Sequence, residues 1–240
     1  MMNDRAEHIS KAFDEELRLL NNRLAEMGGM AEAQLAGAVE ALCRSNAELA
    51  ERVVVRDKEI DALDLEIDMF SVRLVALRQP VAADLRTIFA AIKISSDLER
   101  IGDLAKNIAG RTLAISRFPP LPTTVSIASM ATVVQSMIKQ VLDAWTARDT
   151  QSAADVCARD VEVDQHYASL FRELLTYMME DPRNIGPCTH LLFVAKNLER
   201  VGDHTTNIAE QIGYVVLGTR PPDRQTHDPT NALVPEADSQ

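Results

Sequence analysis

A twelve-residue motif occurs twice in the chain, about a hundred residues apart, and this repeat constrains the possible folds more than any other feature. Residues 98–109 read LERIGDLAKNIA and residues 198–209 read LERVGDHTTNIA, so eight of the twelve positions are identical. At the helical period, one stripe of the motif is apolar: Leu98, Ile101, Ala105 and Ile108, repeated as Leu198, Val201, Thr205 and Ile208. The motif therefore predicts a buried helix in each half of the chain.

A second stripe, about 100° around the same helix, carries side chains with oxygen atoms. It consists of Glu99, Asp103 and Asn107 in the first copy, and of Glu199, Asp203 and Asn207 in the second. Each predicted helix thus has a row of possible oxygen ligands along the edge of its apolar face.

The rest of the chain predicts an all-α protein built as two tandem, similar three-helix bundles. Apolar spacing and chain breaks predict six long helices, at about residues 4–44, 48–78, 82–116, 127–149, 150–180 and 186–217. We expect a first bundle at 1–117, a Pro-rich linker at 118–122, a second bundle at 123–217 and a flexible tail at 218–240. Aromatic residues make up only 4% of the chain, which is typical of packed helices.

Local features add details to this prediction. Gly28 and Gly29 interrupt the apolar stripe of the first helix, so we expect a bend or a close helix contact there. Pro80 ends the second helix and forces Gln79 out of the α region. The apolar spacing of that second helix places Leu77, like Leu74, on its inward side.

Four acidic pairs with i, i+4 spacing occupy equivalent places in the two halves. They are Asp57/Asp61, Glu99/Asp103, Asp160/Asp164 and Glu199/Asp203. Like charges at this spacing repel by a few tenths of a kcal/mol, and by more when they are partly desolvated. Either water and neighbouring Arg or Lys side chains screen them, or a cation lies among them.

Hard oxygen ligands without Cys or regularly placed His suit Mg²⁺, Ca²⁺, Mn²⁺ or iron, and we keep Zn²⁺ as a further candidate. Asn107 and Asn207 are either additional oxygen ligands and donors around such a site, or ordinary exposed helix residues. Gly102 and Gly202 lie between the two acids of their motif, where the missing side chain allows close approach of another helix or of a metal site.

Composition excludes several classes of function. A formal net charge of −11 argues against nucleic acid and anionic membranes as main partners. Residues 1–11 contain no apolar stretch fit for a signal peptide, and we find no apolar run of bilayer-spanning length. Three isolated cysteines without ligand spacing fit a reducing compartment, so we expect a cytoplasmic protein.

The sequence contains none of the common catalytic signatures. Carboxylate-bridged di-iron bundles use Glu-x-x-His on two helices, and this motif does not occur in the chain. No nucleophile with a base, glycine-rich phosphate loop or nucleotide fingerprint appears either. His204 is the one histidine that lies in a motif copy. The corresponding residue of the other copy is Leu104, so we interpret His204 as peculiar to the second half. We therefore predict no catalytic residues.

The combination of motifs resembles the PhoU family, the accessory proteins of the phosphate-specific transport system. The resemblance rests on the paired motif, the upstream acidic pairs and the run RQPVAADLR at 78–86, and it covers nearly all of residues 13–218. Residues 181–188 lack a second copy of that run, so any partner that contacts it would find it only in the first half.

The resemblance implies two three-helix bundles, a tendency to form homodimers, and multinuclear metal sites on the acidic pairs. It also implies a regulatory role: linking the ATPase subunit of the phosphate transporter to a membrane sensor histidine kinase, restraining phosphate uptake, and silencing the phosphate-starvation response when phosphate is plentiful. Two alternatives remain open at this point, a carboxylate-bridged metalloenzyme and a helical interaction protein that binds no metal.

Overall fold

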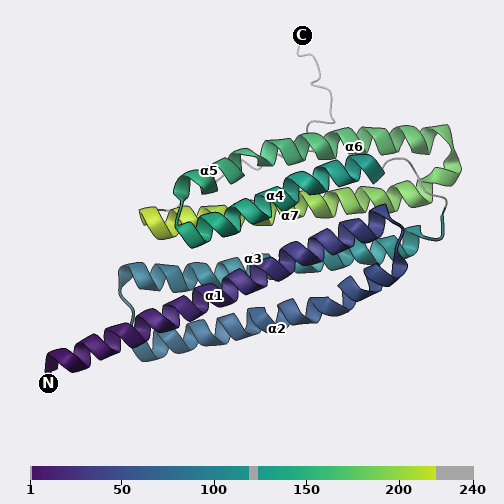
Figure 1. Ribbon diagram of the computed structural model, residues 1–240. Coiled ribbons are helices and arrows are strands. Elements are labelled where there is room, and N and C mark those ends of the chain that lie inside the picture. Colours follow the sequence, from purple (N-terminus) through teal and green to yellow (C-terminus); the bar gives the residue numbers. More distant parts are fainter. Residues whose placement is uncertain (1, 119–123, 220–240) are drawn as a thin grey trace, which may run out of the picture.

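The computed structural model describes residues 2–118 and 124–219, with side chains from residue 11 in the first range and from residue 125 in the second. Every regular element in these ranges is helical, which confirms the predicted all-α class. Most of the predicted linker and tail lies outside the described residues. Figure 1 shows two layers, with the first half of the chain below and the second half above.

The first half is a bundle of three long helices. They are α1 (Met2–Cys43), α2 (Ala47–Arg78) and α3 (Ala82–Ile115). The side chain of Asn46 caps α2 by accepting a hydrogen bond from the backbone N–H of Leu49. Gln79 ends α2 with φ 47° and ψ 57°, outside the right-handed α region, as the proline after it predicts.

The second half repeats this arrangement with one difference. It comprises α4 (Thr124–Ala147), α5 (Thr150–Ala158), α6 (Asp160–Glu180), the short 3₁₀ helix η1 (Pro182–Asn184) and α7 (Ile185–Leu217). The prediction of one helix at 150–180 was wrong, because the helix is interrupted at Arg159. The backbone N–H of Arg159 is shared between the carbonyls of Asp155 and Val156, and its guanidinium group reaches Ser136 on α4 at 2.8 Å. This tertiary contact has no local sequence signal.

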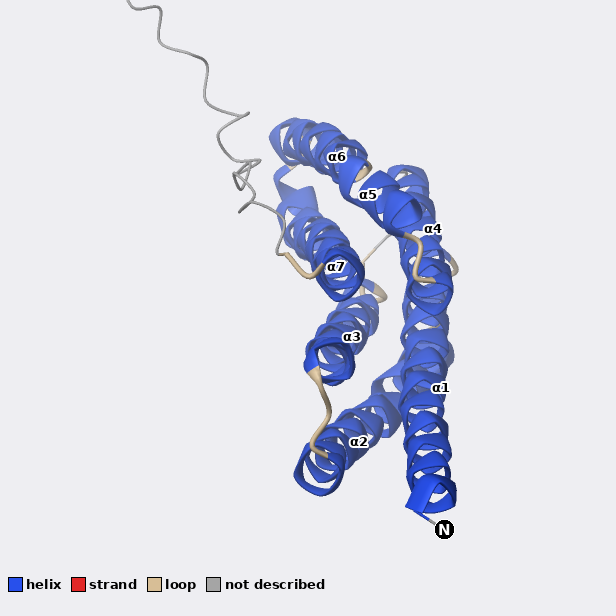
Figure 2. Cartoon of the chain, turned by 90° about the vertical axis from the view of Figure 1, so that its left-hand side faces the viewer, coloured by secondary structure: helices blue, strands red, loops and turns tan. Residues whose placement is uncertain are grey.

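The two halves meet along α3 and α7. Asp97 of α3 contacts His204 of α7, and Arg111 contacts His190, so the two helices run antiparallel. Figure 2 shows α3 and α7 stacked at the centre of the molecule, with α2 and α6 on opposite outer sides. The apolar stripes of both motif copies are fully buried, at 0% exposure for residues such as Leu98, Ile101, Leu198 and Val201.

A second contact between the halves joins α1 to α4. A Cβ atom added to Gly28 would lie 2.4 Å from Cδ2 of Leu142, whereas one added to Gly29 meets nothing within 4 Å. Of the two outcomes expected at this glycine pair, the structure has the close helix contact, and α1 continues through it as one helix.

The prediction that Leu77 faces inward was wrong. Its side chain is 67% exposed, whereas Leu74 is 2% exposed. In this last turn of α2 it is Arg78 that turns toward α1. Its guanidinium group donates two hydrogen bonds to the carboxylate of Glu16, at 2.7 and 3.0 Å. At this end of α2, the contact with α1 is therefore made by Arg78 and not by Leu77.

Helix α4 departs from the expectation that no segment has bilayer-spanning length. Among the described residues, Val125–Ala147 is long and apolar enough to span a bilayer, with a mean hydropathy of 1.3. One side of this helix nevertheless packs inside the protein, where Met130, Val134, Met137 and Val141 are all 0% exposed. This burial is what a core helix of a bundle requires, so length and composition are weak evidence for a membrane span here.

Candidate metal-binding site

The acidic pairs of each half lie where its second and third helices contact each other beside a glycine of the motif. A Cβ atom on Gly102 would lie 3.0 Å from Ile60 and 3.5 Å from Oδ1 of Asp57. The equivalent atom on Gly202 would lie 3.4 Å from Val163 and 3.5 Å from Oδ1 of Asp160. Both glycines therefore allow the close helix contact that the sequence predicts, and both place a carboxylate beside the missing side chain.

The structure brings together the predicted residues of each half. We call Asp57, Asp61, Glu99 and Asp103 the first acidic cluster, and Asp160, Asp164, Glu199 and Asp203 the second acidic cluster. Carboxylates on the neighbouring helix help to raise the pKa values of Asp61 and Glu99 in the first cluster and of Asp203 in the second.

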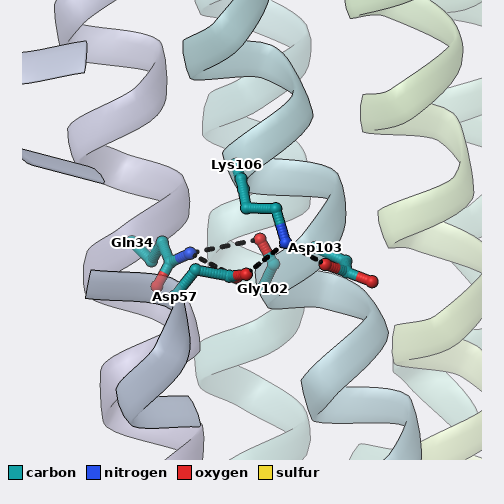
Figure 3. Close-up of polar contacts among 5 residues, drawn as sticks. All are labelled: Gln34, Asp57, Gly102, Asp103 and Lys106. Carbon is teal, nitrogen blue, oxygen red and sulfur yellow. Dashed lines mark hydrogen bonds and ion pairs between the residues drawn. The ribbon is translucent and has the colours of Figure 1, made fainter. Parts of the chain in front are cut away.

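In the first acidic cluster, Asp57 is buried and both of its oxygens accept hydrogen bonds (Figure 3). Gln34 on α1 donates to Oδ1 at 2.9 Å and also to the carbonyl oxygen of Gly102 at 3.2 Å. The ammonium group of Lys106 contacts Oδ2 of Asp57 and donates to Oδ1 of Asp103 at 2.7 Å. Sequence reasoning missed both donors, although Lys106 follows Asp103 at the i, i+3 spacing of a helical ion pair.

Desolvation raises the pKa of Asp61 and that of Glu99. Repulsion adds to this effect, chiefly from Asp57 on Asp61 and from Asp103 on Glu99. In contrast, hydrogen bonds to Asp103 and Asp57 raise the pKa of Lys106 well above its usual range. Lys106 is consequently a permanent positive charge among these carboxylates.

The second acidic cluster has a different set of contacts. Glu199 is 5% exposed, and its Oε1 accepts a hydrogen bond from Lys196 at 2.7 Å. Its Oε2 is buried and has no hydrogen-bond partner. Desolvation, followed by repulsion from Glu199 and Asp160, raises the pKa of Asp203 to about 6, even though part of that side chain is exposed. One buried carboxylate oxygen of this cluster is therefore left without a partner among the described residues.

The two asparagines of the motif lie on the exposed side of their helices. Nδ2 of Asn207 lies 3.4 Å from Oδ1 of Asp97, the carboxylate that also contacts His204. Asn207 thus belongs to the contact between α3 and α7, and a role in supporting metal ligands stays a prediction.

Among the side chains that the structure describes, in residues 11–118 and 125–219, no three of His, Cys, Asp or Glu converge on a point where they would hold a metal ion as they stand. Donor chemistry and charge still distinguish the clusters. The second cluster has a buried oxygen without a partner, which a cation would satisfy. The first cluster already has N–H donors on its buried carboxylate. The second cluster thus offers a hard metal ion an unsatisfied buried oxygen, whereas Gln34 and Lys106 already bond the buried carboxylate of the first.

Comparison with known proteins identifies relatives across nearly the whole chain. The family model of the PhoU domain matches twice, at residues 24–112 and 127–212. The phosphate-specific transport system accessory protein PhoU homolog of Caulobacter vibrioides strain NA1000 is 53% identical over 213 residues, which cover 88% of this chain and 93% of that protein. The protein with the same name from Rhizobium meliloti is 47% identical over 228 residues, covering 94% and 96%.

Two solved structures have the same fold. The crystal structure of PhoU from Pseudomonas aeruginosa matches with a TM-score of 0.84 and 40% identity, covering 86% of this chain and 100% of that one. The phosphate transport system regulatory protein PhoU from Streptococcus pneumoniae matches with a TM-score of 0.82 and 28% identity, covering 88% and 100%.

Proposed function

Because the chain belongs to the PhoU family, we propose that it is a regulatory accessory protein of a phosphate-specific transport system. The observation that carries this proposal is the match of both halves to the PhoU domain, together with 53% identity to a relative of that name over 88% of the chain. The relatives are named as accessory proteins and not as enzymes, which supports action through binding.

The partners we propose are the ATPase subunit of the phosphate transporter and a membrane sensor histidine kinase, which the protein links in the cytoplasm as a homodimer. In this role it restrains phosphate uptake and keeps the phosphate-starvation response silent when phosphate is plentiful. Two packed bundles with long helical faces offer separate surfaces to two partners, which supports an adaptor role.

Gene deletion tests the regulatory role. In cells grown in high phosphate, a reporter of the phosphate-starvation response is expected to be expressed in the deletion strain and to be silent again when the gene is restored. A reporter that stays silent in the deletion strain contradicts the proposal.

A pull-down tests the partners. The tagged protein is expected to retain the transporter ATPase and the sensor kinase from lysates, in amounts that differ between high and low phosphate. An excess of untagged protein is the control, because it competes for specific contacts only. Retention of neither partner at either phosphate concentration argues against the adaptor role.

We further propose that the second acidic cluster binds a divalent or ferric cation, with Mg²⁺, Ca²⁺, Mn²⁺, iron and Zn²⁺ as candidates. Asp160, Asp164, Glu199 and Asp203 would hold the ion. The ion would neutralise their mutual repulsion and connect α6 to α7. Its role is binding, and no turnover of a substrate is attributed to it.

Elemental analysis after gentle purification, with thermal melts before and after chelation, tests this proposal. A bound metal stabilises the folded state, so chelation is expected to lower Tm. The double variant Glu199→Gln/Asp203→Asn is expected to lose metal while its helices remain. The control variant Glu26→Gln/Glu51→Gln removes two exposed acids elsewhere and keeps the metal. If the purified protein contains no metal and chelation leaves its Tm unchanged, the alternative of a metal-free interaction protein is favoured. If the metal-bound protein is inactive in oxidase and phosphatase assays, the enzyme alternative is excluded.

A further inference from the structure

The two acidic clusters differ at two corresponding positions, and the turn between the first two helices of each half establishes the correspondence. Ser45 and Arg148 both adopt positive φ, at 50° and 54°. The next residues, Asn46 and Asp149, both cap a helix with their side chains. Counting along the helices from this turn, Asp57 corresponds to Asp160 and Gln34 to Met137. The repeated motif itself aligns Lys106 with Thr206.

In the first half, the two donors saturate the buried carboxylate. Asp57 has a side-chain exposure of 3%, and one of its oxygens is bonded by Gln34 while the other is bonded by Lys106. Lys106 also bonds Asp103, so its ammonium group joins a carboxylate of α2 to one of α3. The ammonium group thus bridges carboxylates of two helices, as a bound cation would, and supplies one positive charge (Figure 3).

Neither Gln34 nor Lys106 has the same residue type at its corresponding position in the second half. Met137 is buried and has no N–H group to donate. Thr206 is also buried, carries no charge, and donates its hydroxyl to the backbone carbonyl of Asp203 at 2.7 Å. Lys196 of this half bonds Oε1 of Glu199, and the buried Oε2 of the same carboxylate has no partner among the described residues.

We infer that Lys106 replaces a bound metal ion in the first half, so that each chain holds metal only at the second acidic cluster. A dication in the first cluster would have to displace the ammonium group from two carboxylates or remain beside it against charge repulsion. This inference rests on the proposed metal binding of the second cluster. It predicts that the two halves of an internally repeated protein respond differently to metal.

Titration of the chelated full-length protein with Mn²⁺ or Zn²⁺ alone tests the inference, with bound metal counted by elemental analysis and by calorimetry. In a protein that keeps Lys106, the double substitution Glu199→Gln/Asp203→Asn is expected to remove the bound metal. The double substitution Asp61→Asn/Glu99→Gln is expected to leave the amount of bound metal unchanged. The Lys106→Thr variant, which copies the second half, is expected to double the metal bound per chain. The control variant Lys93→Thr removes an exposed lysine from the same helix and changes nothing.

The possible outcomes distinguish failure of this inference from failure of the proposed metal binding by the second acidic cluster. If Asp61→Asn/Glu99→Gln removes about half of the metal from the wild type, the inference is overturned and metal binding stands. If the wild type binds neither ion, both are overturned. The wild-type comparison does not depend on whether Lys106→Thr folds. A folded Lys106→Thr variant without additional metal also contradicts the inference.

Discussion

Nδ1 of His204 on α7 lies 2.9 Å from Oδ1 of Asp97 on α3, and this contact joins the two halves of the protein. Both side chains are largely buried, with exposures of 14% and 15%. Toward the other end of the same helix pair, the guanidinium group of Arg111 lies 4.0 Å from the ring centroid of Phe193. Contacts near the middle and toward one end of the pair thus help to fix the register of the two helices.

Replacing His204 by the residue of the first motif copy tests this contact. His204→Leu is expected to lower the free energy of unfolding by about 1–2 kcal/mol, because Asp97 then keeps only the weak bond from Asn207. Urea denaturation measures the change. The double variant Asp97→Leu/His204→Leu is expected to recover part of the loss, and a double-mutant cycle without coupling contradicts the interpretation.

Gly28 and Gly29 form a natural pair of test and control sites. Both gain about 1 kcal/mol of helix propensity when changed to Ala, but only a Cβ at Gly28 collides with Leu142. We expect Gly28→Ala to be less stable than Gly29→Ala by about 1–3 kcal/mol in urea denaturation. The difference is expected to shrink in a Leu142→Ala background, and equal stabilities would contradict the close contact.

Lys106 is also expected to stabilise the metal-free fold. Lys106→Met leaves the buried carboxylate of Asp57 with Gln34 as its remaining described donor, at a cost of roughly 2 kcal/mol after allowing for the partial exposure of the lysine. Chemical denaturation in the presence of a chelator measures this cost. Adding Asp57→Asn is expected to restore part of the stability, whereas the exposed control Lys93→Met has little effect.

The pair of Glu16 and Arg78 predicts a pH dependence of stability. The hydrogen bonds from Arg78 lower the pKa of Glu16 from its ordinary value of 4.5. The unfolded state therefore binds the proton more readily, and the pair contributes stability above the unfolded pKa that is lost as pH falls through the folded pKa.

Arg78→Met is accordingly expected to be less stable than the wild type at pH 7, and the difference narrows as pH falls through 4.5 toward the lower pKa of Glu16 in the folded state. Thermal or urea unfolding over this range measures it. Arg52→Met is the control, since its exposed partner Glu48 is expected to contribute about 0.5 kcal/mol or less. A difference independent of pH would contradict the role of the ion pair.

Part of the candidate site was predictable because helical period and repetition are local properties of a sequence. The i, i+4 acids and Gly102 or Gly202 share a helix, so their spacing alone predicted one edge of each cluster. Gln34 lies on another helix, 23 residues from Asp57, and its donor role depends on how α1 packs against α2. The interruption at Arg159 similarly depends on contacts with α4.

The sequence by itself determined the helical class, the duplication, the buried stripes and the pairing of acids within each helix, because all of these follow from residue spacing along a 3.6-residue period. Only the tertiary structure decided which charges meet. Two clusters that look equivalent in sequence differ because Gln34 and Lys106 reach the first one, while Met137 and Thr206 stand at the corresponding positions of the second. Side-chain contacts between helices depend on packing distance and orientation, which residue spacing within one helix does not specify.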